Sequence, residues 1–176
     1  MEQDKLLGDE RRERLLGWLK ETRNPITGSE LARRTKVSRQ VIVQDISLLK
    51  AKNEPIIATA QGYVYINQDF SAMVSKVIAC KHTPEQTEQE LTIMVDHGVT
   101  VKDVIVEHPV YGEITANLRL SNRREVQHFL SRIQQSNASL LSNLTDGIHL
   151  HTLVATNEAA LIRVERELEK EGFLLV

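Results

Sequence analysis

Two helix starts lie close together in TGSELARRTKVSRQVIVQDISLLKAKN, residues 27–53, and this spacing limits what the chain can fold into. Thr27 and Glu30 have the spacing of a capping box, and Ser38 is a second helix N-cap. A short helix over roughly residues 28–35 fits between the two starts, and a longer helix follows the turn. Apolar side chains recur every three or four residues along the longer helix, so one of its faces is built for packing. The pattern predicts a helix-turn-helix.

The flanking segments extend this motif. Before it, Leu15, Leu16 and Leu19 recur with helical spacing. After it, IIATAQGYVYI reads as two strands joined around Gln61 and Gly62. Three helices followed by a hairpin predict a winged helix-turn-helix domain over residues 1–66.

Such a domain places the N-terminal residues of its second motif helix in the major groove of DNA. Residues 23–52 carry seven Lys/Arg against two Asp/Glu, which suits contact with phosphates. Gln40 can pair with adenine, and Arg39 can reach a guanine or a phosphate. The expected contacts to double-stranded operator DNA are Arg33, Arg34, Lys36, Ser38, Arg39, Gln40 and Gln44. The alternative is a winged helix used for protein contact, with a solvated basic face.

A polar linker, NQDFSA, separates this domain from a second one over residues 72–176. Strand-like and helix-like segments alternate there in the order βαββαβ, followed by a further helix and a strand, FLLV. This is the split βαβ order of a ferredoxin-like domain, with helices on one face of an antiparallel sheet. The fold class is therefore α+β.

The segment GIHLHTL, residues 147–153, alternates histidines with apolar residues, so His149 and His151 share one face of a strand. In a ferredoxin-like sheet this fourth strand lies antiparallel beside the first, which ends just before His82. We therefore expect the three imidazoles to meet at one sheet edge, with Glu90 on the following helix nearby. Such a set suits zinc, nickel, iron or manganese. The alternative to a metal site is that His149 and His151 are ordinary strand residues that face solvent or form hydrogen bonds in the core.

Three motifs, CKHTPEQTEQEL, EHPVYGEI and GIHLHTL, follow the winged helix in that order. With it they resemble the nicotinate-responsive repressors of the NiaR family over essentially the whole chain. The resemblance implies a three-histidine sensor and dimerisation domain that binds a divalent metal and nicotinic acid, the co-repressor of niacin-uptake and NAD-biosynthesis genes. It implies that the metal ligands are His82, Glu90, His149 and His151. It also implies a homodimer on the operator.

The nicotinate carboxylate calls for a cationic or N–H donor, and its ring for a stacking partner. The candidate effector residues are His108, Tyr111, Arg119 and Arg123. His108 precedes a proline in a turn-like segment, so a role in the turn and a role in the pocket are both open.

The bulk composition is that of a globular chain without a membrane span or signal peptide. The single Cys80 excludes an internal disulfide and fits a reducing cytoplasm. Neither a phosphate-binding loop nor a dinucleotide fingerprint is present, so we do not expect an enzyme. Two rivals remain: a regulator in which the metal itself is the signal, and a metal-dependent hydrolase fused to a DNA-binding domain.

Overall fold

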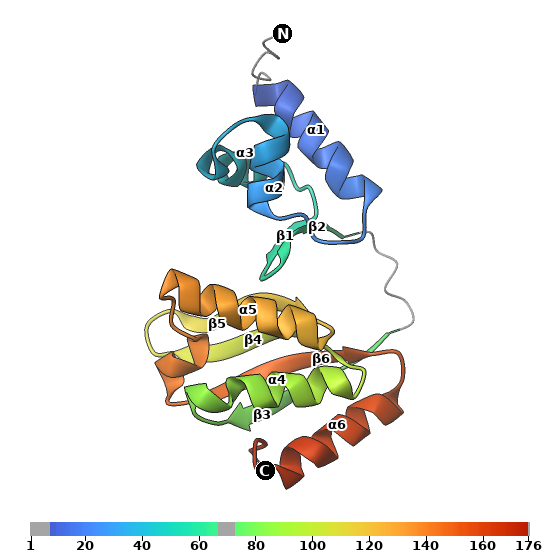
Figure 1. Ribbon diagram of the computed structural model, residues 1–176, viewed down its shortest axis with the longest axis vertical. Helices are drawn as coiled ribbons and strands as arrows, with labels where there is room; N and C mark the ends of the chain where they lie inside the picture. The colour runs from blue at the N-terminus through green and yellow to red at the C-terminus, as the bar shows by residue number, and fades with distance from the viewer. Residues whose placement is uncertain (1–7, 67–72, 176) are drawn as a thin grey trace. The chain divides into compact units, whose positions relative to one another are not determined.

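The computed structural model describes residues 8–66 and 73–175. Its contacts divide the chain into two compact units, residues 1–69 and 70–176 (Figure 1). The expected linker, residues 67–72, lies outside the described residues. Among the helices that the structure describes, none combines the length and apolarity needed to cross a membrane.

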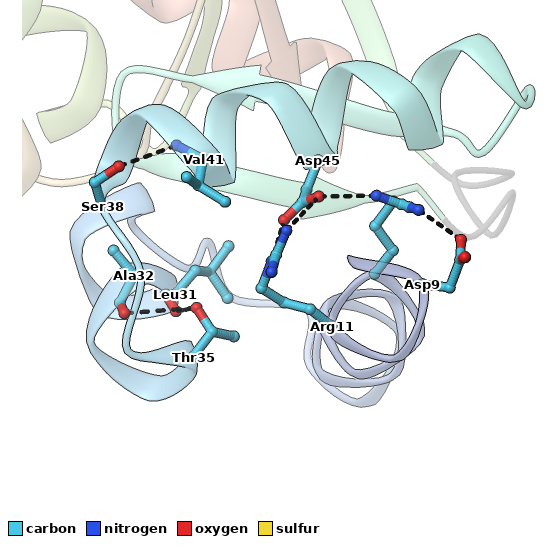
Figure 2. Close-up of polar contacts among 9 residues, drawn as sticks. Asp9, Arg11, Leu31, Ala32, Thr35, Ser38, Val41 and Asp45 are labelled. Atoms are coloured by element: carbon cyan, nitrogen blue, oxygen red, sulfur yellow. Dashed lines mark hydrogen bonds and ion pairs between the residues drawn. The ribbon is translucent and has the colours of Figure 1, made fainter. Parts of the chain in front are cut away.

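The first unit is the predicted winged helix-turn-helix. Its elements are α1 (Gly8–Glu21), α2 (Gly28–Thr35), α3 (Arg39–Ala51), β1 (Ile56–Thr59) and β2 (Gly62–Tyr65). The hydroxyl of Thr27 accepts the backbone N–H of Glu30. The hydroxyl of Ser38 accepts the backbone N–H of Val41 (Figure 2). Both motif helices therefore begin where the sequence predicted.

A buried ion pair joins α1 to α3 beside the apolar core of this unit. The Nε and Nη2 atoms of Arg11 lie 2.5 and 3.2 Å from the two carboxylate oxygens of Asp45, and Arg12 adds a contact of 3.2 Å (Figure 2). Asp45 is only 1% exposed and Arg11 8% exposed. The pair therefore links α1 to α3, because a buried charge is stabilised only where an opposite charge and hydrogen bonds compensate it.

Substituting Asp45→Ala should destabilise the first unit by about 3–5 kcal/mol, since it removes the buried carboxylate that binds two nitrogens of the Arg11 guanidinium. Urea unfolding followed by the fluorescence of Trp18, the single tryptophan, measures this unit selectively. Glu10→Ala removes the half-exposed partner of Arg14 on the same helix and should leave the midpoint almost unchanged. Equal midpoints for the two variants would contradict a stabilising role for the buried pair.

The second unit packs three helices against a four-stranded sheet. Its main elements are β3 (Val74–Lys81), α4 (Thr87–Asp96), β4 (Thr100–His108), β5 (Gly112–Leu120), α5 (Arg123–Ser136), β6 (Ile148–Ala155) and α6 (Glu158–Lys170). Two short 3-10 helices, η1 (Pro84–Gln86) and η2 (Leu141–Thr145), precede α4 and β6. Helices α4 and α5 lie side by side on one face of the sheet (Figure 1), and α6 contacts α4, β3 and β6. The predicted α+β class is confirmed, and so is the element order up to α6.

The strand order is β3-β6-β4-β5, and all three neighbouring pairs are antiparallel. Strands β3 and β4 are therefore parallel, joined by α4 and split by β6, as a split βαβ unit requires. The inserted strand is the fourth of the domain, whereas a ferredoxin-like sheet inserts the third. This order gives β6 two neighbours and buries every second side chain along it.

The final segment departs from the prediction of a last strand. Leu174 makes a single bridge to Cys80, and Val176 lies outside the described residues. Phe173, 1% exposed, packs edge-on against His82 with ring centroids 5.6 Å apart. The N–H of Lys81 donates to the carbonyl of Phe173 and the N–H of Leu175 to that of Ala79, each at 2.9 Å, so the segment pairs with β3 over this one bridge and not as a full strand.

Candidate metal and effector site

Three buried imidazoles meet at one end of β6. His149 and His151 point to the helix-covered side and are 3% and 2% exposed, while Ile148 on the opposite side is 44% exposed. The register pairs Cys80 with His149, so the chain leaving β3 brings His82 to the same place. Ring centroids lie 4.9 Å apart for His82 and His149, and 4.8 Å apart for His149 and His151. The structure thus brings together the three histidines that the sequence singled out.

The carboxylate of Glu90, on the first turn of α4, lies among these rings and is 1% exposed. Its Oε2 atom is 2.8 Å from Nε2 of His82 and 3.5 Å from Nε2 of His151. Its Oε1 atom is 3.2 Å from Nε2 of His149. One carboxylate therefore faces the same nitrogen of all three rings.

The other nitrogen of each ring is held by a backbone carbonyl. Nδ1 of His82 lies 2.7 Å from the carbonyl oxygen of Thr83, and Nδ1 of His149 lies 2.9 Å from that of Gly147. Nδ1 of His151 lies 2.6 Å from the carbonyl oxygen of Asp103. Because a carbonyl can only accept, each Nδ1 carries the proton, and a neutral ring is left with a lone pair on Nε2. This is the tautomer in which histidine binds a metal.

These contacts set up an electrostatic conflict that a cation resolves. Burial lowers the pKa of His82 and of His151, but the hydrogen bond and charge of Glu90 raise it by more, so both end above the usual value. Burial raises the pKa of Glu90, but the charge of His151 and the hydrogen bonds of the three rings hold it well below its usual value. Three protonated rings around one carboxylate would leave excess positive charge without a counterion in a buried site. One divalent cation would instead accept three neutral Nε2 atoms and the carboxylate, so these residues fit a metal.

Backbone features hold the rings in place. Gly147 has φ +87°, and a Cβ atom there would lie 2.2 Å from the carbonyl oxygen of His82. The β4 ladder shifts register between Val101 and Ile105, and within this bulge the carboxylate of Asp103 accepts the N–H of Thr152 at 2.9 Å. The glycine and the bulge therefore position His82, His149 and His151 from outside the cluster.

Cys80 belongs to the same cluster, although the sequence suggested only that it forms no disulfide. Its Sγ, a carboxylate oxygen of Glu90 and a ring nitrogen of His149 all lie within 4.8 Å of one another. Burial raises the pKa of the Cys80 thiol, and the charge of Glu90 adds to this, so the group stays protonated. Its position opposite His149 in the strand register is the signal that could have placed it here.

A cavity of about 140 Å³ adjoins the cluster inside the second unit. Its floor is made by the three histidines, Glu90 and Thr87. Its other lining residues are mostly apolar and come from the sheet, α4, α5 and the segment before β6: Leu91, Val104, Ala116, Leu118, Phe129, Ile133, Ser139, Leu140, Leu141 and Ser142.

The four effector candidates chosen from the sequence do not line this cavity. Nδ1 of His108 accepts the N–H groups of Val110 and Tyr111, each at 3.2 Å, so this histidine shapes the β4–β5 turn. Tyr111 is 79% exposed in that turn. The guanidinium of Arg123 binds the carboxylate of Asp96, with its Nε atom 2.7 Å from one oxygen. Arg119, on β5, has φ +57° and also lies outside the lining. An effector site at these four residues therefore stays a prediction, and the cavity beside the cluster is a separate candidate.

The residues expected to contact DNA fall into two groups. Arg39, Gln40 and Gln44 are exposed on one face of α3, and Ser38 caps its start. Lys36 ends α2 in the left-handed conformation, with φ 53°. Arg33 and Arg34 both hydrogen-bond the carboxylate of Glu30, and these bonds lower its pKa. Phosphate contacts by these two arginines would therefore compete with Glu30.

The winged helix-turn-helix defines the chain as a DNA-binding regulator, and the buried three-histidine cluster distinguishes its second domain. Residues 11–64 match a family described as an HTH domain, and residues 75–176 match the 3H domain. The chain is 55% identical to "Transcription repressor NadR" of Bacillus subtilis, over 99% of this chain and 98% of that protein. It is 40% identical to "Probable transcription repressor NiaR" of Thermotoga maritima, over 97% of each. The chain belongs to this NadR/NiaR family of 3H-domain proteins.

Substituting Gly147→Ala should disrupt the cluster, because the new methyl group would collide with the backbone of His82. Gly112→Ala is the matched control, since Gly112 also has positive φ, +71°, but open space around its Cβ position. The control should lose only the roughly 1–2 kcal/mol of left-handed strain. We expect Gly147→Ala to unfold at a clearly lower temperature than Gly112→Ala and to bind zinc more weakly in a competition titration. Indistinguishable behaviour of the two variants would show that the close approach to His82 does not hold the site.

Proposed function

We propose that the chain is a transcription repressor of niacin-uptake and NAD-biosynthesis genes that uses a divalent metal and takes nicotinic acid as its co-repressor. The names of its relatives support repression. The observation that supports metal and effector binding by the second unit is the cluster itself. Each of its three rings has Nδ1 bound to a backbone carbonyl and Nε2 directed at one buried carboxylate.

The proposed metal ligands are His82, Glu90, His149 and His151. Three imidazole nitrogens and one carboxylate oxygen suit zinc, nickel, iron or manganese. The metal would supply a fixed positive charge at the floor of the cavity. Because Glu90 neutralises one of its two charges and the rings are neutral, one net positive charge remains for an effector to balance.

The cavity sets the size and charge of that effector. An engineered cavity of about 150 Å³ in another protein holds benzene, so a cavity of about 140 Å³ suits a single six-membered ring with a small substituent. Nicotinate is such a ring and carries one negative charge, which matches the charge left at the metal. Nicotinamide has nearly the same shape but no charge, so the site should favour the acid.

The first unit supplies the proposed operator contacts. Gln40 and Gln44 are exposed on the same face of α3, near its N-terminus, with Arg39 beside them. Side chains in this position of a recognition helix reach base edges in the major groove. The basic charge around them would add the phosphate attraction that holds the domain on the duplex.

We also propose a two-fold dimer formed through the second unit. The sheet face away from the helices exposes apolar side chains, with Val77 at 53% and Ile148 at 44% exposure. A second copy could cover this face, and a two-fold dimer carries two recognition helices, one for each half-site of an operator. Nicotinate can change operator affinity only by favouring the arrangement that fits those half-sites.

Operator binding measured by fluorescence anisotropy tests the proposal. Salt is held constant because phosphate contacts make the affinity salt-dependent. The protein is compared without effector, with nicotinate and with nicotinamide, each before and after removal of metal by a chelator. We expect nicotinate to tighten binding in the metal-loaded protein, nicotinamide to act much more weakly, and chelation to abolish the response.

The other outcomes identify the rivals. Operator affinity that follows metal alone would make the metal the signal. Operator affinity that ignores both metal and nicotinate would rule out control through the three-histidine site.

A further inference from the structure

Thr87 lines the cavity beside the three-histidine cluster and carries a buried hydroxyl. It begins α4, one turn before Glu90, and is only 7% exposed. Its Oγ1 atom is buried and has no hydrogen-bond partner among the described residues, and the residue lines the cavity. A buried hydroxyl without a partner destabilises a fold, so such groups are rare unless a bound molecule satisfies them.

The rest of the lining indicates what that molecule is like. Leu118, Phe129 and Ile133 form an apolar wall that suits the faces of a flat ring. Besides the three-histidine cluster, the polar side chains of the lining are those of Thr87, Ser139 and Ser142. Among these hydroxyls, that of Thr87 is the one recorded in the described residues as buried without a hydrogen-bond partner. Among the described residues that line the cavity there is no lysine or arginine, so a ligand carboxylate would need a hydroxyl donor to orient it.

We propose that Thr87 is the effector-binding residue that positions the carboxylate: its hydroxyl donates a hydrogen bond to a carboxylate oxygen of a single-ring aromatic acid. This inference rests on the proposed function, and it deepens it by naming a specificity residue that lies outside the metal ligands. The cluster supplies the charge that balances the acid, and Thr87 fixes which part of the ligand faces that charge. A hydroxyl that must stay available for a ligand also explains why the fold leaves it unpaired.

The substitution Thr87→Val separates this role from a structural one. Valine has the shape of threonine but lacks the hydroxyl, and removing a buried unpaired hydroxyl should leave the metal-free protein as stable or more stable. The same change should weaken nicotinate binding, because the carboxylate would lose its donor. If the hydroxyl served only the fold, Thr87→Val would instead lower the stability of the metal-free protein.

The test is calorimetric titration of zinc-loaded full-length protein with nicotinate, nicotinamide and benzoate. Zinc content is measured for every variant. Thr87→Val should bind nicotinate about tenfold to a hundredfold more weakly than the unmodified chain, while Thr87→Ser should stay within a few-fold of it. Thr92→Val, at a half-buried threonine of the same helix outside the lining, is the control and should bind normally.

The outcomes distinguish this inference from the function on which it rests. Normal nicotinate affinity in Thr87→Val, with zinc bound, would overturn the role of Thr87 and leave the proposed function standing. A melting temperature for Thr87→Val well below that of Thr92→Val would likewise count against it, because the hydroxyl would then serve the fold. No nicotinate binding by the unmodified zinc-loaded chain would overturn both.

Discussion

The arrangement of the second unit depends on one buried carboxylate and the three rings that face it. Glu90 is 1% exposed, and each ring that faces it already has its other nitrogen bound to a backbone carbonyl. Neutral imidazoles cannot donate to a carbonyl and to the carboxylate at once, and charged imidazoles would leave excess positive charge in the interior. A divalent cation satisfies all of these groups together. Under the proposed function, the cavity beside the cluster would be the place where a small anion meets the positive charge of that cation.

The fold contributes to this site through strand order and backbone shape. Because β6 lies between β3 and β4, its histidines are covered by neighbours on both sides as well as by α4. The bulge in β4 turns the carbonyl of Asp103 toward His151, and Gly147 allows His82 and His149 to approach. None of these features binds a ligand itself, yet each sets the position of a ring. In the first unit, too, one carboxylate binds several partners: that of Glu30 accepts hydrogen bonds from Arg33 and Arg34 on α2.

Much of this was readable from the residues. The spacing of Thr27 and Ser38 predicted both motif helices, because N-caps act locally. The alternation in GIHLHTL predicted two histidines on one face, and the pairing of the first and fourth strands predicted that His82 joins them. These inferences worked because local capping and strand periodicity depend on few residues.

Other features depend on contacts that no local pattern encodes. The place of Cys80 opposite His149 requires the strand register, and the cavity requires the packing of α5 and of the 3-10 turn before β6. The effector candidates were chosen for their chemistry alone, and the structure uses His108 to hold a turn and Arg123 to pair with Asp96. The apolar run at the end of the chain predicted a strand, but it does not reveal that the pairing there is a single bridge or that Phe173 packs against His82.

X-ray absorption spectroscopy of the purified, metal-loaded protein tests the central claim most directly. We expect one bound divalent ion per chain. The first coordination sphere of this ion should give the scattering signature of three imidazole rings and additional oxygen. Substitution of His149 by Ala should remove one imidazole from that signature. A bound metal without imidazole ligands, or a protein that binds no divalent metal at all, would contradict it.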